Sequence, residues 1–445
     1  MKIPVIDMIT RRRVFGMARL FFISMMLMSV FSPTLLAQDV MRFPAPEFES
    51  SYVFPLTTEP DPTSQVQQYA DVVVLFGALV LATIFDLKLR SRKGLFWTMV
   101  FSLGYFGFYR QGCVCPIGAI QNVAFSIFSV KYAVPISVLI FFIMPLIFAG
   151  LFGRVFCASV CPLGAIQDLV LLKPIKLPTK LSQALSTIPY IYLGTGVLLA
   201  ASGSAFIICR YDPFIGFFRL NGNAPDLYMG AVFLLVGIFI GRPYCRFFCP
   251  YGVLLGWMSK FAKWHLTITP SECVQCRLCE DSCPFDYIHK PNTGLAREES
   301  RVGVRRLGWL LVALPLMIGL GGWVGNKAAE PLSRADRSVF TAEQLLEEQA
   351  NPNLEPTLYT KTFRTMGEPE DDLIDRAVAA RTNFGLAGWI LGGFIGLVFG
   401  LKLISLSTSR HRRDYEADKT HCFSCGRCYP YCPSDDMHKL NFLEV

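Results

Sequence analysis

The sequence predicts an all-α polytopic membrane bundle. Hydrophobic residues make up 52% of its 445 residues and charged residues only 17%, a balance too apolar for a soluble protein of this size. It also contains long uncharged runs, and a helix needs about 20 apolar residues to cross the hydrocarbon of a bilayer. The apolar run at 227–240 is only 14 residues long, and residues 113–130 form a further uncharged stretch. The predicted number of spans can therefore differ by one. About seven spans are expected, near residues 72–85, 94–109, 132–152, 187–208, 227–240, 307–324 and 384–401.

The N-terminus has the form of an export signal. Arginines occupy positions 11–13, an apolar stretch follows, and Ala37 is a small residue suited to cleavage. Arg12 to Phe15 also resembles a twin-arginine signal, although arginines before an apolar run more often reflect ordinary orientation by positive charge. We therefore expect a signal peptide or an uncleaved anchor at 1–37.

Charge sets the expected topology. If 38–69 is periplasmic, the first span ends in four basic residues between Lys88 and Lys93, as the positive-inside rule requires. Alternation then places the loop 325–383 in the periplasm, where it forms a small cap or a partly disordered connector. The net charge of +8 is explained by cytoplasmic loops that face anionic lipid, and no nucleic-acid partner is expected.

Two cysteine runs complete the predicted fold class. Each has the form C-x2-C-x2-C-x3-C-P, and an even number of spans separates them, so they lie on the same, cytoplasmic, face. In two-cluster ferredoxins the fourth cysteine of one run ligates the cluster held by the other run. We therefore expect a cytoplasmic two-cluster ferredoxin-like module assembled from two separated segments. One [4Fe-4S] cluster is assigned to Cys273, Cys276, Cys279 and Cys432, and the other to Cys422, Cys425, Cys428 and Cys283.

Zinc and disulfides are the alternatives for these eight thiols. Thiolate quartets also suit zinc, but two copies of the complete spacing with both prolines favour iron–sulfur clusters. A reducing cytoplasm disfavours disulfides.

Three further elements form an internal repeat. Cys115, Cys161 and Cys249 each precede Pro-x-Gly and an apolar stretch. Proline fits the first turn of a helix, so each thiol is expected at a helix N-terminus, where the helix dipole stabilises a thiolate. The alternative is that these cysteines are small buried hydrophobic residues.

The predicted topology divides the remaining thiols into two sets. Four lie at the cytoplasmic ends of spans and could converge on one metal centre or form two redox-active pairs: Cys157, Cys161, Cys245 and Cys249. Three lie at the periplasmic ends, as a metal or redox site that Asp212 could complete or as a disulfide from Cys209 to one of the others: Cys113, Cys115 and Cys209. Additional iron–sulfur or metal centres in the membrane domain are thus expected.

Several chemistries are excluded by what the sequence lacks. None of its five histidines lies inside a predicted span, so a membrane haem with two imidazole ligands has nothing to hold it. It contains no C-x-x-C-H motif, Gly-rich phosphate loop or nucleotide-binding fingerprint.

The order of C-x3-C-P elements followed by paired ferredoxin motifs resembles the NosR/NapH-type polytopic membrane polyferredoxins. The resemblance covers roughly 70–300 and 405–435. It implies electron transfer at the bacterial inner membrane in support of a periplasmic reductase or its maturation. The chain departs from the family pattern in two ways. Cys113 and Cys115 are separated by one residue instead of three, and no periplasmic flavin-attachment domain is present. Any covalent flavin would then sit on a partner.

Two functions follow as expectations. The first is an electron conduit between a cytoplasmic donor or quinol and a periplasmic partner, a flavin-bearing protein or a metalloenzyme, with redox partners on both faces. The second is an accessory, maturation or redox-sensing protein.

The expected organisation is a signal or anchor at 1–37, a periplasmic segment at 38–69, a membrane domain at 70–265, ferredoxin halves at 266–303 and 407–445, spans at 304–324 and 384–406, and the periplasmic loop at 325–383.

Overall fold

The computed structural model describes residues 64–112, 115–129, 132–220, 224–268, 273, 275–292, 300–351, 354–408 and 412–432. The predicted signal peptide or anchor at 1–37 lies outside the described residues, as does most of the segment 38–69.

The described chain is mainly helical, and four of its helical stretches are long and apolar enough to span a membrane. Three shorter apolar helices accompany them: α4 (Pro116–Phe128), α5 (Ile136–Phe152) and α11 (Ala224–Gly237). The expected span at 94–109 is α3 (Arg92–Ser102) continued by a π-helical turn, η2 (Leu103–Tyr109). The four long stretches are α2 (Gln65–Thr83) with η1 (Ile84–Lys88), α7 (Thr179–Leu185) with α8 (Ile188–Ala201), α15 (Ser300–Ser333), and α18 (Glu370–Ser407).

Local signals fix several helix boundaries. Ser64 and Ser91 precede α2 and α3, and their hydroxyl oxygens accept hydrogen bonds from Gln67 N (3.3 Å) and Gly94 N (3.2 Å). These bonds satisfy N–H groups that have no partner within the helix. At the other end of α5, Gly153 adopts a φ of +77°, a conformation that favours glycine and turns the chain into the thiol-bearing segment.

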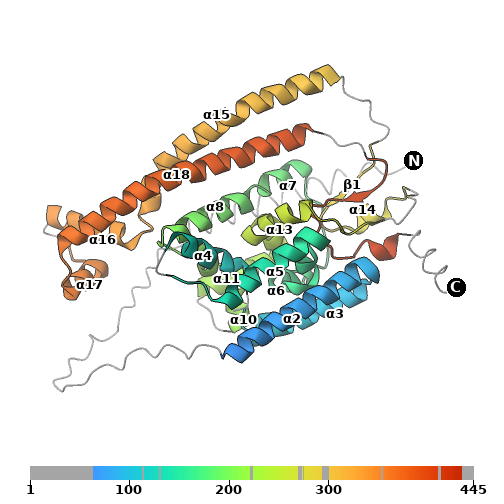
Figure 1. Cartoon of the computed structure of the whole chain (residues 1–445), viewed down its shortest axis with the longest axis horizontal. Coiled ribbons are helices and arrows are strands. Elements are labelled where there is room, and N and C mark those ends of the chain that lie inside the picture. Colours follow the sequence, from blue (N-terminus) through green and yellow to red (C-terminus); the bar gives the residue numbers. More distant parts are fainter. Residues whose placement is uncertain are drawn as a thin grey trace. The chain divides into compact units, whose positions relative to one another are not determined.

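Helices α15 and α18 lie side by side along much of their length (Figure 1). Glycines at the interface allow their backbones to meet: a Cβ on Gly392 would overlap the carbonyl oxygen of Gly321, and one on Gly325 would overlap that of Gly388. Small residues spaced by four commonly permit close packing of membrane helices. The two helices that separate the ferredoxin motifs therefore form a tight hairpin.

The loop between these helices is itself helical. Helices α16 (Arg337–Ala350) and α17 (Leu358–Met366) pack against the start of α18 around Val339, Leu345 and Phe363. Glu348 accepts hydrogen bonds from Thr360 Oγ1 (2.5 Å) and Arg364 (2.9 Å). In these described parts, the segment predicted as a cap or a connector is a small folded unit.

A pair of short strands joins the two ferredoxin segments. Strand β1 (Ile288–His289) pairs antiparallel with β2 (Glu416–Ala417). Asp418 N adds a hydrogen bond to Tyr287 O (2.8 Å). The two cysteine runs, far apart in sequence, are thereby held together.

The close approach of α15 and α18 gives a test of the hairpin. We expect Gly392→Ala to destabilise the protein by about 1–3 kcal/mol, because the added methyl group has no room beside Gly321. The measurement is thermal unfolding of the detergent-purified protein. Gly393→Ala is the matched control, since its Cβ would lie 3.6 Å from Ile318, an ordinary contact. Equal unfolding temperatures for the two variants would contradict the packing.

Candidate metal centres

The two cysteine runs interleave in space. Cys279 interacts electrostatically with Cys273 and Cys276 of its own run and with Cys432 of the other run. Burial, followed by the charge of these neighbours, raises the pKa of Cys279 to about 11. A metal cation bound among these thiols would favour their ionised form.

The second predicted set of four cysteines also combines three cysteines of one run with the fourth cysteine of the other run. Cys283 interacts with Cys425, and Cys422 interacts with Cys425, Cys428 and Cys283. Burial raises the pKa of Cys283 as well. Cysteines of both runs are therefore neighbours, and the assignment of each cysteine to one cluster stays a prediction.

A histidine–aspartate cluster supports the second run. Asp418 Oδ2 lies 3.2 Å from His289 Nε2 and 3.0 Å from His421 Nδ1. Burial alone would raise the pKa of Asp418, but hydrogen bonds from the two histidines hold it well below its usual range. The carboxylate also accepts from the backbone N of Thr420 (2.8 Å), which shapes the turn before Cys422.

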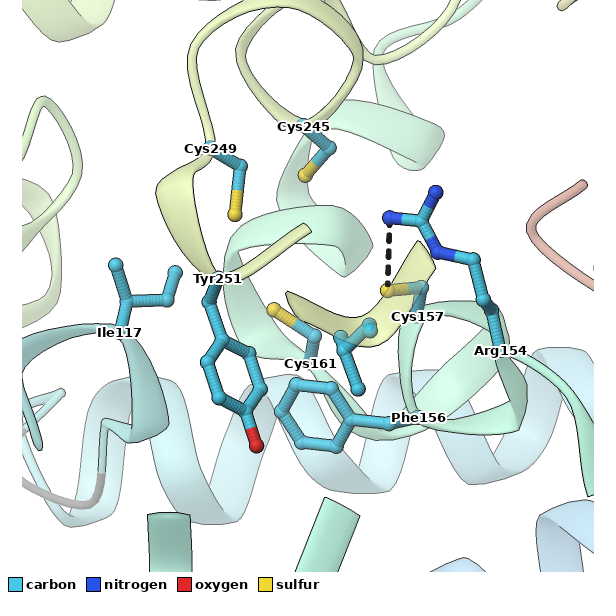
Figure 2. A pocket seen from close by; sticks show the side chains of 9 residues that line it. Ile117, Arg154, Phe156, Cys157, Cys161, Cys245, Cys249 and Tyr251 are labelled. Atoms are coloured by element: carbon cyan, nitrogen blue, oxygen red, sulfur yellow. Dashed lines mark hydrogen bonds between the residues drawn. The ribbon is translucent and has the colours of Figure 1, made fainter. Parts of the chain in front are cut away.

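A second group of thiols lines one pocket in the membrane domain. The repeat contributes a pair from each copy: Cys157 in η3 (Phe156–Val160) with Cys161 before α6 (Pro162–Leu169), and Cys245 in α12 (Pro243–Phe247) with Cys249 before α13 (Pro250–Lys260). Figure 2 shows the four sulfurs turned toward the same space. The remaining lining residues are Ile117, Arg154, Phe156, Tyr251 and Leu255.

Hydrogen-bond donors are directed at the pocket sulfurs. Gly252 N lies 3.3 Å from Cys249 Sγ, and Gln167 Nε2 lies 3.2 Å from Cys245 Sγ. Arg154 donates to Cys157 Sγ at 3.7 Å. Donors to sulfur stabilise its anionic form and tune iron–sulfur centres. These donors would stabilise the cysteines as thiolate ligands of a bound metal centre.

The spacing of the thiols bears on what they could hold. Within the described ranges, no three His, Cys, Asp or Glu side chains are close enough to share a single metal ion. A four-iron cluster sits between its thiolates and therefore holds them farther apart than one zinc ion does. Four cysteines around a common space are a donor set that suits either a zinc ion or an iron–sulfur cluster.

An aromatic wall connects the two groups of thiols. The rings of Phe285 and Phe423 pack edge to face with centroids 5.0 Å apart. Cys157 and Cys245 of the pocket and Cys283 and Cys425 of the ferredoxin module all belong to the hydrophobic cluster around these rings. The pocket and one ferredoxin thiol set are therefore direct neighbours.

A buried carboxylate anchors this contact. Asp168, at the end of α6, lies 2.9 Å from Arg92, 3.3 Å from Arg242 and 3.1 Å from Arg427. Burial opposes its charge, but the three guanidinium groups outweigh burial and hold the pKa of Asp168 below its usual range. One side chain thus ties three helical segments of the membrane domain to the second ferredoxin half.

The third predicted set is described only in part, because Cys113 lies outside the described residues. Cys115 precedes α4 and interacts electrostatically with Cys209 and Asp212. Cys209, in α9 (Ile207–Arg210), places its sulfur against Gly118 in the first turn of α4, and its backbone N donates to Gln121 Oε1 (3.1 Å). Both described thiols are free.

The cysteine motifs alone did not indicate Arg154, Arg242, Gln167 or Asp168. A signal for two of them is present, since Gly-Arg stands three residues before the first cysteine in both C-x3-C-P copies, at Arg154 and Arg242. The longer repeat G-R-x2-C-x3-C-P therefore marks these arginines.

Comparison with known proteins gives a family match. A family described as a 4Fe-4S binding domain matches residues 112–135, 134–180 and 227–269, the segments that carry the three repeated cysteine elements. The uncharacterised protein MJ0750 of Methanocaldococcus jannaschii is 31% identical over 191 residues, which cover 41% of this chain and 77% of that protein. No solved structure matches.

Two further relatives share part of the chain. YccM of Escherichia coli, provisionally named an electron transport protein, is 25% identical over 187 residues, 38% of this chain and 52% of YccM. The regulatory protein NosR of Stutzerimonas stutzeri is 28% identical over 216 residues, 45% of this chain and 29% of NosR. The chain therefore spans about half of YccM and under a third of NosR.

The crossed ferredoxin sets predict which thiols each substitution exposes. In Cys432→Ser, alkylation should first reach Cys273, Cys276 and Cys279, because their cluster loses its fourth ligand. In Cys283→Ser, it should first reach the thiols of the other set, Cys422, Cys425 and Cys428. Mass spectrometry of the alkylated protein measures both patterns, and the reverse pattern would contradict the crossing.

The anchor at Asp168 predicts a stability difference. Asp168→Asn should lower the free energy of unfolding by about 3–5 kcal/mol, because three guanidinium groups lose their anion. Glu368→Gln, which removes an exposed ion pair with Arg376, is the control and should cost less than about 1 kcal/mol. Thermal unfolding in detergent compares the two variants, and a similar small effect in both would disprove the anchoring role.

Proposed function

Because this chain belongs to the NosR/NapH-type family of membrane 4Fe-4S proteins, we propose that it carries electrons across the bacterial inner membrane. A cytoplasmic donor or quinol would lie at one end and a periplasmic partner, flavin-bearing or a metalloenzyme, at the other. The observation that carries this proposal is the aromatic wall, where Phe285 and Phe423 contact thiols of both the ferredoxin module and the membrane pocket.

Separate groups of cysteines would hold the redox centres. Each of the two ferredoxin sets would hold a [4Fe-4S] cluster. The first set is Cys273, Cys276, Cys279 and Cys432, and the second is Cys283, Cys422, Cys425 and Cys428. The four pocket thiols would hold a further redox centre. Such groups supply storage and transfer of single electrons without making or breaking bonds to a substrate.

The side of the membrane follows from the basic end of the first span. Arg90 donates to Ile268 O (2.9 Å) and Arg92 donates to Cys425 O (2.8 Å), so these arginines contact the ferredoxin module. Basic residues that flank a span mark the cytoplasmic side. This contact supports a cytoplasmic ferredoxin module.

A route toward the other face begins at the pocket. Tyr244 is buried and interacts with Cys249 of the pocket as well as with Cys115 and Asp212. About 30 Å of hydrocarbon separates the two faces, so a conduit needs groups at more than one depth. Cys115 and Cys209, together with Cys113, are the proposed periplasmic end.

A regulatory or maturation role is the alternative, and the printed name of NosR as a regulatory protein is the reason to test it. A protein of that kind would need its clusters intact but no transfer from one face to the other. Vectorial electron transfer therefore separates the two functions.

Sealed vesicles provide the test. With a membrane-impermeant reductant outside and an impermeant acceptor inside, the protein should reduce the acceptor, and Cys249→Ser should lower the rate to that of protein-free vesicles. Replacing Cys113, Cys115 and Cys209 together by serine should have the same effect while leaving the ferredoxin clusters in place.

Ser159→Ala, in the segment between Cys157 and Cys161, is the matched control and should retain transfer, because Ser159 contributes no thiol. Iron content is measured in every variant. Undiminished transfer in the Cys249 variant would rule out the pocket as part of the conduit, and transfer absent from the unmodified protein would favour the regulatory function.

A further inference from the structure

Arg154 is a buried cation on the wall of the thiol pocket. It follows Gly153 at the end of α5 and is only 5% exposed. Figure 2 shows its guanidinium group beside Cys157, and this is the 3.7 Å hydrogen bond to sulfur described above. Its charge therefore faces the space that the four sulfurs surround.

The other contacts of Arg154 lack a negative charge. It donates to Thr420 O (3.4 Å) and stacks 4.8 Å from the centre of the Phe423 ring, while its Nε is buried without a hydrogen-bond partner. No carboxylate among the described residues forms an ion pair with it. A buried cation without an anion is costly, and the charges with which it interacts most are the thiols Cys157 and Cys249 and the hydroxyl of Tyr287.

Neighbouring arginines reinforce the imbalance. Arg242, fully buried, interacts with Cys157 and Cys245 of the pocket and with Cys425, yet it shares its one carboxylate, Asp168, with two other arginines. The region between the pocket and the ferredoxin module thus carries more guanidinium groups than carboxylates. An oxidised four-iron cluster with four thiolates has a net charge of about −2 and would supply the missing anion.

We propose that Arg154 is a positioning residue that sets the reduction potential of the redox centre held by Cys157, Cys161, Cys245 and Cys249. Reduction adds one electron, and hence one negative charge, without making or breaking a bond. A fixed positive charge next to the sulfurs stabilises the reduced form more than the oxidised form. This inference rests on the proposed function only in taking the pocket to hold a redox centre.

The test is an equilibrium redox titration of the purified protein, followed by electron paramagnetic resonance. The signal that disappears in Cys249→Ser is assigned to the pocket. In Arg154→Met the equilibrium constant for reducing this centre should fall about tenfold or more, a shift of about 59 mV to lower potential. Arg154→Lys, which keeps the charge, should retain most of the original potential.

Arg246→Met is the matched control. Arg246 is also a buried arginine without a carboxylate partner among the described residues, but it contacts Ser182, Phe247 and Tyr287 instead of the pocket sulfurs. Its loss should shift the pocket signal less than the loss of Arg154. If Arg154→Met does not retain iron, Arg154→Gln removes the charge while keeping hydrogen-bond donors and gives the same measurement.

The outcomes are distinct from those of the vesicle experiment. An unchanged potential in Arg154→Met or Arg154→Gln at full iron content would overturn the inference, as would an equal shift in Arg246→Met. A protein in which Cys249→Ser removes no signal would overturn its premise. None of these results requires electron transfer across a membrane. The proposed role of Arg154 can therefore be correct even if the protein does not carry electrons across the membrane.

Discussion

The ion cluster around Asp168 joins three segments of the membrane domain to the second ferredoxin half. A charged carboxylate inside a membrane domain must be compensated, and here three arginines from three separate segments do so. Arg92 also reaches the backbone of Cys425, and Arg242 bonds to the carbonyl of Ala158 (3.2 Å). The position of the ferredoxin module against the membrane domain depends on this arrangement, and so does the contact between its thiols and the pocket.

The aromatic wall and the arginines act on the same contact in different ways. Phe285 and Phe423 exclude water between the pocket and the module, which lowers the local dielectric constant and strengthens every charge interaction there. Arg154 and Arg242 lie over the Phe423 ring, at 4.8 and 5.6 Å from its centre. Their charges are therefore close to both thiol groups and poorly screened. An interface built in this way is suited to anionic centres on both sides.

The sequence was most informative where chemistry dictates spacing. The spacing of the two cysteine runs predicted that Cys279 and Cys283 would have neighbours from the other run, as they do. The repeat around Cys161 and Cys249 indicated that these thiols share an environment. Hydropathy was less informative about the number of spans, since four helical stretches of the described chain are long and apolar enough to cross a membrane, while α4, α5 and α11 are shorter apolar helices. Asp168 could not have been predicted, because its partners come from distant segments and only the folded chain brings them together.

The separation of the two ferredoxin halves has a consequence for biosynthesis. On the crossed assignment, neither set has four ligands until the second cysteine run has been synthesised, because Cys428 completes one set and Cys432 the other. By then the hairpin of α15 and α18 must already have entered the bilayer for β2 to reach β1. Cluster loading therefore comes after insertion of the last helices. A chain that stalls or inserts its hairpin incorrectly cannot complete either cluster, so iron–sulfur assembly reports on the integrity of the whole membrane domain.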